Sequence, residues 1–172
     1  MPTSGTNRPG PLGILPLNTP SGATPDHLVL ERLGIDAAIE TTEFVDEYPA
    51  SPSAPDVVAW YKRSALLGTP GVTVIGGMTG ISDAGPSAFT RLSEVIPGDQ
   101  LLITAVDGAV VHYDVQENTV VTQSPDFTTL LADTSLERLM LLGWDGAYQE
   151  AVATVGIQVV SGVRVPVSSV DD

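Results

Sequence analysis

The side chains that could carry covalent chemistry in this sequence are few, and none is a thiol. The 172 residues include no cysteine, two histidines (His27 and His112) and one lysine, Lys62. The absence of cysteine excludes disulfides, zinc sites with cysteine ligands and thiolate nucleophiles. Covalent catalysis would therefore need a hydroxyl activated by a neighbouring base.

Hydroxyl and carboxylate side chains gather after two apolar runs. Thr79, Ser82 and Asp83 follow the first run, and Asp145 follows the second. These groups could become neighbours in space and form a hydrolase or transferase site. A hydroxyl stays inert at neutral pH, however, unless a histidine or lysine lies beside it to accept its proton. This catalytic set is one alternative for the function.

Neither histidine is placed to act as that base. His112 lies in the alternating run 111–115, in which every second side chain points to the same face of a strand. This alternation puts His112 on the polar face together with Asp114. The pattern favours a solvated histidine beside a carboxylate over a catalytic pair.

The charge balance excludes several classes of partner. The chain has 21 acidic and 7 basic residues and a formal net charge of −14, so nucleic acid and other phosphate-rich partners would be repelled. Glu43, Asp46 and Glu47 lie in the proline-broken loop 43–56, but their spacing matches no calcium-loop pattern. We expect a solvated acidic loop, no metal site and no cofactor.

The two ends of the chain differ from its middle. Residues 1–26 contain six prolines among Gly, Ser, Thr and Asn, at positions 2, 9, 11, 16, 20 and 25, and such a segment is predicted to be a flexible linker. Residues 168–172 form a short acidic tail. No apolar run of 18 residues and no secretory leader are present, so we expect any membrane anchor to lie upstream of Met1.

The middle of the chain, residues 27–167, reads as one all-β domain. About eight short runs rich in Val, Ile and Thr are separated by Gly, Pro and Asp, as is typical of a small closed barrel filled by its own side chains. Apolar residues at 89, 92 and 95 predict a short helix over 88–95. Asp107 and Gly108 predict a hairpin between strands at 101–105 and 109–115.

Several short motifs occur in the order seen in one known family. They are Trp60-Tyr61, Pro70-Gly71, Val74-Ile75-Gly76-Gly77, Gly85-Pro86, Phe89-Thr90-Arg91-Leu92, Pro97-Gly98-Asp99 and Asp107-Gly108. On these motifs the chain resembles the sortases of Gram-positive cell surfaces, particularly the class E/F group. The resemblance implies a closed, mixed, eight-stranded sortase-like β-barrel with one or two short helices.

The same resemblance implies that the catalytic side chains are missing. Met78 stands where the family pattern has its histidine, and Gly143 and Trp144 stand where it has threonine and the cysteine nucleophile. No arginine occurs between Arg138 and Arg164, and Arg164 lies too late in its strand to be the family's oxyanion-stabilising arginine. A thioether and an indole can neither attack a carbonyl nor exchange the required proton.

The resemblance also implies a groove, which the sequence leaves either filled or open. The candidate groove residues are Met78, Thr79, Ser82, Trp144, Asp145 and Trp60. Large apolar side chains at these strand ends could plug the groove, or could turn it into an apolar slot for an extended peptide.

The resulting expectation is a sortase-like pseudoenzyme that lies outside the cell membrane. Such a domain would bind or scaffold an extended peptide or a surface protein, including an active sortase or its substrate. The alternatives are the relocated catalytic set described above and a passive structural spacer within a larger surface protein.

Overall fold

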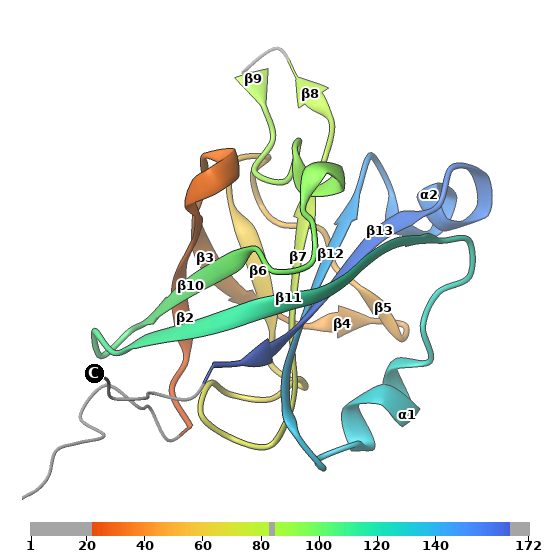
Figure 1. The fold of residues 1–172 in the computed structure, drawn as a ribbon. Coiled ribbons are helices and arrows are strands. Elements are labelled where there is room, and N and C mark those ends of the chain that lie inside the picture. Colours follow the sequence, from red (N-terminus) through yellow and green to blue (C-terminus); the bar gives the residue numbers. More distant parts are fainter. Residues whose placement is uncertain (1–21, 83–84, 166–172) are drawn as a thin grey trace, which may run out of the picture.

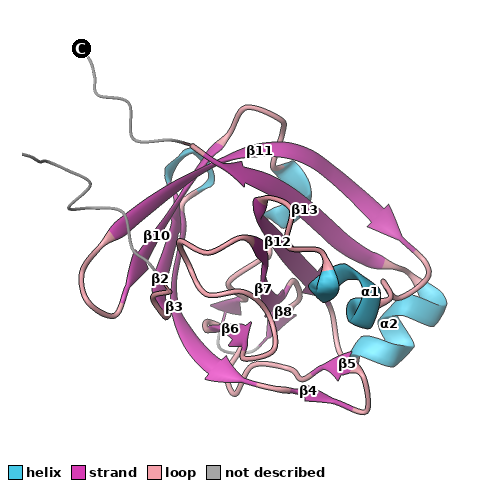
Figure 2. Cartoon of the chain, turned by 90° about the horizontal axis from the view of Figure 1, so that it is seen from below, coloured by secondary structure: helices cyan, strands magenta, loops and turns pink. Residues whose placement is uncertain are grey.

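Eight strands form one closed barrel in the computed structural model, which describes residues 22–82 and 85–165 (Figures 1 and 2). The order around the barrel is β10-β11-β13-β12-β7-β6-β3-β2. The pairs β7 with β12 and β3 with β6 are parallel, and the other pairs are antiparallel. The predicted closed, mixed, eight-stranded barrel is therefore confirmed.

The barrel strands are β2 (Pro25–Leu30), β3 (Ile35–Thr42), β6 (Val58–Tyr61), β7 (Gly71–Met78), β10 (Gln100–Ala105), β11 (Val110–Val121), β12 (Glu137–Trp144) and β13 (Ile157–Arg164). Two small hairpins pair β4 (Phe44–Val45) with β5 (Tyr48–Pro49) and β8 (Ile81–Ser82) with β9 (Gly85–Pro86). The helices are the 3₁₀ helices η2 (Glu31–Leu33) and η3 (Leu92–Glu94) and the α-helices α1 (Phe127–Ala132) and α2 (Tyr148–Thr154).

The predicted linker, 1–26, lies partly outside the described residues, and the predicted acidic tail lies wholly outside them. Strand β2 begins at Pro25, and the backbone N–H groups of Gly22 and Ala23 already donate to the Leu67 carbonyl, at 2.9 and 3.0 Å. The chain is therefore attached to the barrel a few residues before His27. The rest of the predicted linker and the predicted acidic tail, 168–172, lie outside the described residues.

The predicted short helix over 88–95 is present only in part, as a 3₁₀ helix. Hydrogen bonds there join residues three apart, from Leu92 N to Phe89 O at 2.9 Å and from Val95 N to Leu92 O at 3.2 Å, and only Leu92–Glu94 is a 3₁₀ helix. Phe89, Leu92 and Val95 are nevertheless all buried, as the pattern indicated. An apolar residue at every third position suits the three residues per turn of a 3₁₀ helix better than the 3.6 of an α-helix.

The predicted hairpin at Asp107-Gly108 is present, between β10 and β11. Gly108 has φ +91°, a left-handed conformation that glycine adopts without strain, and the Asp107 carboxylate accepts a hydrogen bond from Ala109 N at 3.0 Å. The last strand, β13, runs without a break from Ile157 to Arg164.

The two faces of the barrel wall carry two separate apolar clusters. Along β12, Leu139 and Leu141 point into the barrel core, whereas Leu142 and Trp144 point to the outside, because side chains alternate along a strand. We call the second set the outer cluster. Its buried members are Ala59, Tyr61, Val72, Val74, Phe127, Leu142, Trp144, Tyr148, Ala151 and Ile157. Helices α1 and α2 and the β4–β5 hairpin lie outside the barrel on this side (Figure 2).

An ion pair fixes the segment that precedes β10. Arg32 donates from Nε to Asp99 Oδ1 at 2.6 Å and from its terminal nitrogen to Asp99 Oδ2 at 2.8 Å and to the Glu94 carbonyl at 2.8 Å. The Arg32 guanidinium, followed by the Ile96 N–H, holds the pKa of Asp99 below its usual range. The pair thereby ties η3 and the turn after it to η2.

We predict that Asp99→Asn lowers the midpoint of thermal unfolding at pH 7 by about 2–4 °C. Because the folded pKa is lowered, the carboxylate stabilises the fold above the unfolded pKa of 3.8, and this contribution is lost as the pH falls through the folded pKa. Thermal unfolding followed by circular dichroism from pH 7 to pH 2 should show the gap between variant and wild type closing in acid. Glu117→Gln, an exposed control on β11, should cause no such gap, and a gap of unchanged size at pH 2 would contradict the assignment.

Candidate functional site

Met78 and Trp144, the predicted neighbours at the strand ends, lie side by side. They are the last residues of the parallel strands β7 and β12 and are paired in register. Paired residues of adjacent strands point to the same face, so both side chains are directed to the outside of the barrel, the face of the outer cluster. The site is extended by the Thr79 N–H, which donates to the Trp144 carbonyl at 3.0 Å.

The indole of Trp144 is packed into the wall of the barrel. The residue is 1% exposed, and its six-membered ring covers Gly76 on the neighbouring strand. A Cβ atom on Gly76 would lie 2.9 Å from two carbons of that ring and 2.5 Å from the Tyr61 hydroxyl oxygen. Such distances are too short for non-bonded atoms, so the Trp144 ring can occupy this position only because Gly76 has no side chain.

Aromatic side chains from the covering elements complete the outer cluster. Tyr148 of α2 meets Trp144 edge to face with ring centroids 5.0 Å apart, and Phe44 of β4 lies 4.9 Å from both Tyr61 and Phe127. Edge-to-face and offset contacts of this kind add to the stability that burial provides. The outer face of β7 and β12 is therefore filled by the chain's own side chains.

The polar atoms in this cluster are not prepared for catalysis. Burial raises the pKa of Tyr61 and Tyr148, which keeps both hydroxyls protonated. The Tyr61 hydroxyl donates to the Ala50 carbonyl at 2.6 Å, and the Tyr148 hydroxyl is 2.8 Å from Ser124 Oγ. The Trp144 indole nitrogen is buried and has no hydrogen-bond partner among the described residues.

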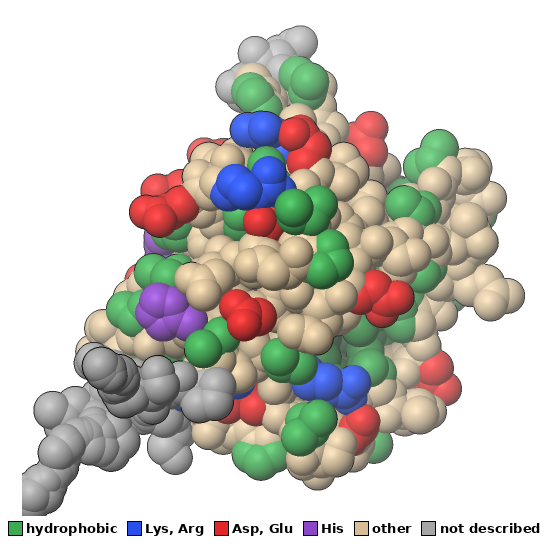
Figure 3. All heavy atoms as spheres, in the orientation of Figure 1, with side chains coloured by type: hydrophobic (Ala, Val, Ile, Leu, Met, Phe, Trp, Pro, Cys, Tyr) green, Lys and Arg blue, Asp and Glu red, His purple; other side chains and the backbone are tan. Residues whose placement is uncertain are grey.

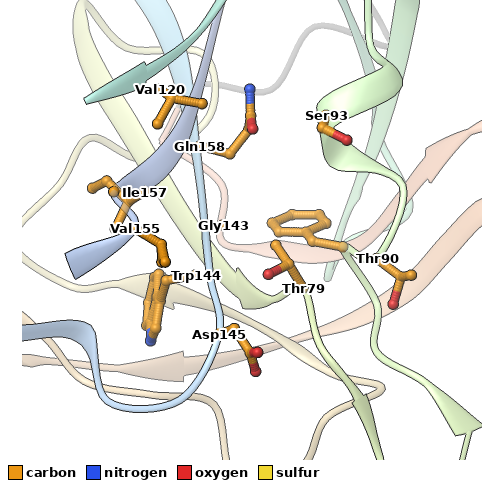
Figure 4. A pocket seen from close by; sticks show the side chains of 12 residues that line it. Thr79, Thr90, Ser93, Val120, Gly143, Trp144, Asp145, Val155, Ile157 and Gln158 are labelled. Atoms are coloured by element: carbon orange, nitrogen blue, oxygen red, sulfur yellow. The ribbon is translucent and has the colours of Figure 1, made fainter. Parts of the chain in front are cut away.

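A pocket of about 270 Å³ lies next to the outer cluster, at the end of the barrel (Figure 4). Its floor includes Gly143, whose side-chain direction is opposite to that of Trp144; a Cβ there would meet Leu92 and Thr79 side chains at 2.7 and 2.8 Å. The pocket therefore lies at the end of β12, bordered by Gly143 and by Trp144 and Ile157 of the outer cluster. The lining residues are Thr79, Phe89, Thr90, Ser93, Val120, Gly143, Trp144, Asp145, Val155, Gly156, Ile157 and Gln158.

The structure brings together three of the predicted groove residues in this pocket, namely Thr79, Trp144 and Asp145. Met78 is half-buried on the outer face and does not line it. Trp60 lies apart from the other candidates: it is 5% exposed, belongs to the barrel core and donates from Nε1 to the Ala65 carbonyl at 3.2 Å. For Ser82 only the backbone, in β8, is described.

Comparison with known proteins connects this barrel to a family. The sequence model of the Sortase domain family matches residues 28–143, which is more than half of the chain. The chain belongs to the sortase family. The matched part ends one residue before Trp144, and the class E/F subgroup remains a prediction. A search of curated proteins finds no match.

Solved sortase structures share the fold. A lid mutant of sortase A from Corynebacterium diphtheriae is 19% identical with a TM-score of 0.62, over 85% of this chain and 72% of that one. Sortase C-1 from Actinomyces oris is 20% identical with a TM-score of 0.59, over 81% and 73%. Sortase C1 from Streptococcus agalactiae is 16% identical with a TM-score of 0.62, over 83% and 68%. At these identities the likeness concerns the fold.

Arg164 lies too far from the strand ends to replace the arginine of the sortase pattern. Strand β13 runs antiparallel to β12, so Arg164 is near the start of β12, where it donates to Glu137 Oε1 and Oε2 at 2.7 and 2.9 Å. The residue paired with Gly143 is instead Gln158. We had not selected Gln158 from the sequence; the available signal was a lone polar residue in the apolar run that ends at Val160.

The relocated catalytic set is not assembled among the described residues. No hydrogen bond there joins the Thr79 hydroxyl to the Asp145 carboxylate, no histidine or lysine lines the pocket, and Asp83 lies outside the described residues. His27 is hydrogen-bonded to Asp36. His112 is exposed on β11, between the buried residues Val111 and Tyr113, as the alternation indicated.

The acidic loop is partly neutralised by the two basic residues after Trp60. Lys62 lies 3.7 Å from Glu43, and Arg63 lies 3.4 Å from Glu47. On the face drawn in Figure 3, basic side chains likewise lie beside acidic ones. In residues 22–82 and 85–165 no group of three or more His, Asp or Glu side chains could hold a metal ion.

We predict that Gly76→Ala lowers the free energy of unfolding by about 1–3 kcal/mol, because the new methyl group collides with the Trp144 ring. Chemical denaturation of the variant measures this loss. In the Trp144→Leu background the same substitution should cost less, since part of the collision is removed. An equal cost in both backgrounds would contradict the proposed contact between Gly76 and Trp144.

Proposed function

We propose that this sortase-family domain does not catalyse transpeptidation and acts instead by binding or scaffolding surface proteins or peptides. The observation that carries the proposal is the buried indole of Trp144 at the position of the family's cysteine nucleophile, packed over Gly76. The sequence left open whether this side chain plugs the groove or lines a slot, and the filled outer face favours the plug.

Acyl transfer needs a nucleophile, an acid for the leaving amine and a donor for the oxyanion. Neither Trp144 nor Met78 can act as the nucleophile or as the acid. Arg164 is engaged by Glu137 at the opposite end of β12 and β13, so it cannot stabilise an oxyanion at Trp144. Loss of one such group usually costs several powers of ten in rate, and here all three roles are unfilled.

Access to the outer face is a second obstacle. A peptide lying along β7 and β12 would have to displace Trp144 and Tyr148, which are 1% and 5% exposed. Truncation of one buried large aromatic side chain costs about 3–5 kcal/mol, whereas a ligand with a millimolar Kd gains about 4 kcal/mol. Because both side chains would have to move, the total cost exceeds the gain from weak peptide binding, so the open pocket beside the cluster is the better candidate for recognition.

The proposed setting is the outside of a Gram-positive cell, where sortases act. None of the described helices is long and apolar enough to cross a bilayer. The proposed partner is an extended peptide or surface protein, with an active sortase or its substrate as specific candidates. A passive spacer is the second candidate function, and the filled outer face favours it too; binding at the pocket separates the two.

The direct test is a transpeptidation assay with the full chain, LPxTG- and LAxTG-type peptides and a glycine nucleophile, followed by mass spectrometry. We predict no transfer and no hydrolysis under conditions in which an active cysteine sortase gives product. Product that vanishes in Thr79→Ala or Asp145→Asn would overturn the proposal and support the relocated catalytic set. Product unaffected by these changes but lost in Trp144→Ala would place catalysis at the outer face.

A further inference from the structure

We infer that Asp145 is a modification site, at which the chain isomerises spontaneously from aspartate to isoaspartate. Aspartate followed by glycine is the sequence most open to this reaction, because glycine places no side chain beside the attacking backbone nitrogen. The chain contains two such pairs, Asp107-Gly108 and Asp145-Gly146, and both are followed by alanine. The folded structure protects the first pair and leaves the second able to react.

The reaction needs no enzyme, cofactor or oxidant. The backbone nitrogen of Gly146 attacks Cγ of the protonated Asp145 carboxyl group, one oxygen of that group leaves with two protons as water, and a succinimide ring forms. A second water molecule then opens the ring. Attack at the Cγ carbonyl restores aspartate, whereas attack at the main-chain carbonyl gives isoaspartate, in which the main chain runs through Cβ and Cγ. The mass of the chain is therefore unchanged.

At Asp107 both reacting groups are held by hydrogen bonds. The Gly108 N–H donates to the Ala105 carbonyl at 2.9 Å, and the Asp107 carboxylate accepts from the Ala109 N–H at 3.0 Å. Both bonds belong to the tight turn between β10 and β11. Ring closure at this turn requires the nitrogen and the carboxyl group to leave these partners first.

At Asp145 neither reacting group is held in this way. Within residues 22–82 and 85–165 no hydrogen bond engages the Gly146 N–H or the Asp145 carboxylate, which only packs against Gly80. In other respects the two pairs are alike. All four residues are exposed, and Gly108 and Gly146 have φ values of +91° and +76°. Hydrogen bonding is therefore the difference that decides which pair reacts.

The position of Asp145 gives the reaction a consequence for the outer cluster. Residues 145–147 are the whole connection between Trp144, at the end of β12, and Tyr148, at the start of α2. The rings of these two residues meet edge to face. Isoaspartate adds one carbon atom to the main chain of this short connection and works against that contact, so we expect modified chains to unfold at a lower temperature.

The test is to age the full chain at pH 5.5 and 37 °C for about four weeks, digest it with trypsin and locate isoaspartate by electron-transfer mass spectrometry. Cleavage after Arg138 and Arg164 yields a peptide in which Asp145 is the only aspartate. We expect roughly tenfold more isoaspartate at Asp145 than at Asp107, a factor consistent with two hydrogen bonds that must first be broken. Equal amounts at the two sites, more at Asp107, or none at either would overturn the inference.

Unfolded chain is the matched control. In 6 M guanidinium chloride the turn at Asp107 is lost, and the two sites should form isoaspartate at similar rates because both lie in the sequence Asp-Gly-Ala. A preference for Asp145 that persists in denaturant would show that the fold does not cause it, and would contradict the role assigned to the hydrogen bonds.

Two variants test the site itself. Asp145→Asn loses ammonia instead of water and should form the same ring faster at neutral pH; folded variant without isoaspartate at position 145 would overturn the inference. Gly146→Asn places a side chain beside the attacking nitrogen, in a residue that tolerates positive φ, and should suppress the reaction at Asp145 several-fold without changing it at Asp107. Aged wild type, but not aged Gly146→Asn, should show an added unfolding transition at lower temperature. The same transition in both would refute the effect on the outer cluster. None of these outcomes depends on a partner or on a catalytic group, so they leave the proposed function to its own test.

Discussion

The contact between Trp144 and Gly76 is the constraint on which the site depends. A ring of this size fits against β7 only because residue 76 has no side chain, and once it is there the outer face of two parallel strands is closed. Helices α1 and α2 and the β4–β5 hairpin pack on the resulting apolar surface through Phe127, Tyr148 and Phe44. The indole of Trp144 thus closes this face of the barrel.

The barrel could be predicted from the sequence because short stretches of the chain indicate its strands and turns. Alternation in Val111 to Val115 and the Asp107-Gly108 turn each specify a strand or a connection. The resemblance to sortases, rather than these local patterns, implied that Met78 and Trp144 lie at adjacent strand ends, where the structure pairs them. The helix over 88–95 is shorter than predicted, and the pattern did not define its type, because a repeat of three residues fits a 3₁₀ helix as well as one face of a short α-helix.

The state of the site could not be read from the sequence, because it depends on contacts between distant residues. From the sequence, Trp144 could equally have lined an open slot. Its burial depends on contacts with Gly76 and Tyr148, and the types of these two residues do not indicate that they contact Trp144. Gln158 is a comparable case, since only the pairing of β12 with β13 puts it opposite Gly143. Trp60, in contrast, was selected for its place in a motif, and it is part of the barrel core.

The most direct measurement for the filled outer face is the NMR signal of the Trp144 indole N–H during titration with an LPxTG-type peptide. A Trp60→Phe variant assigns the signal, since the chain has two tryptophans. The buried indole predicts a resonance that does not move and whose hydrogen exchanges slowly with solvent. A saturable shift of that resonance, or rapid exchange in the free protein, would show that the face is open and would contradict this account.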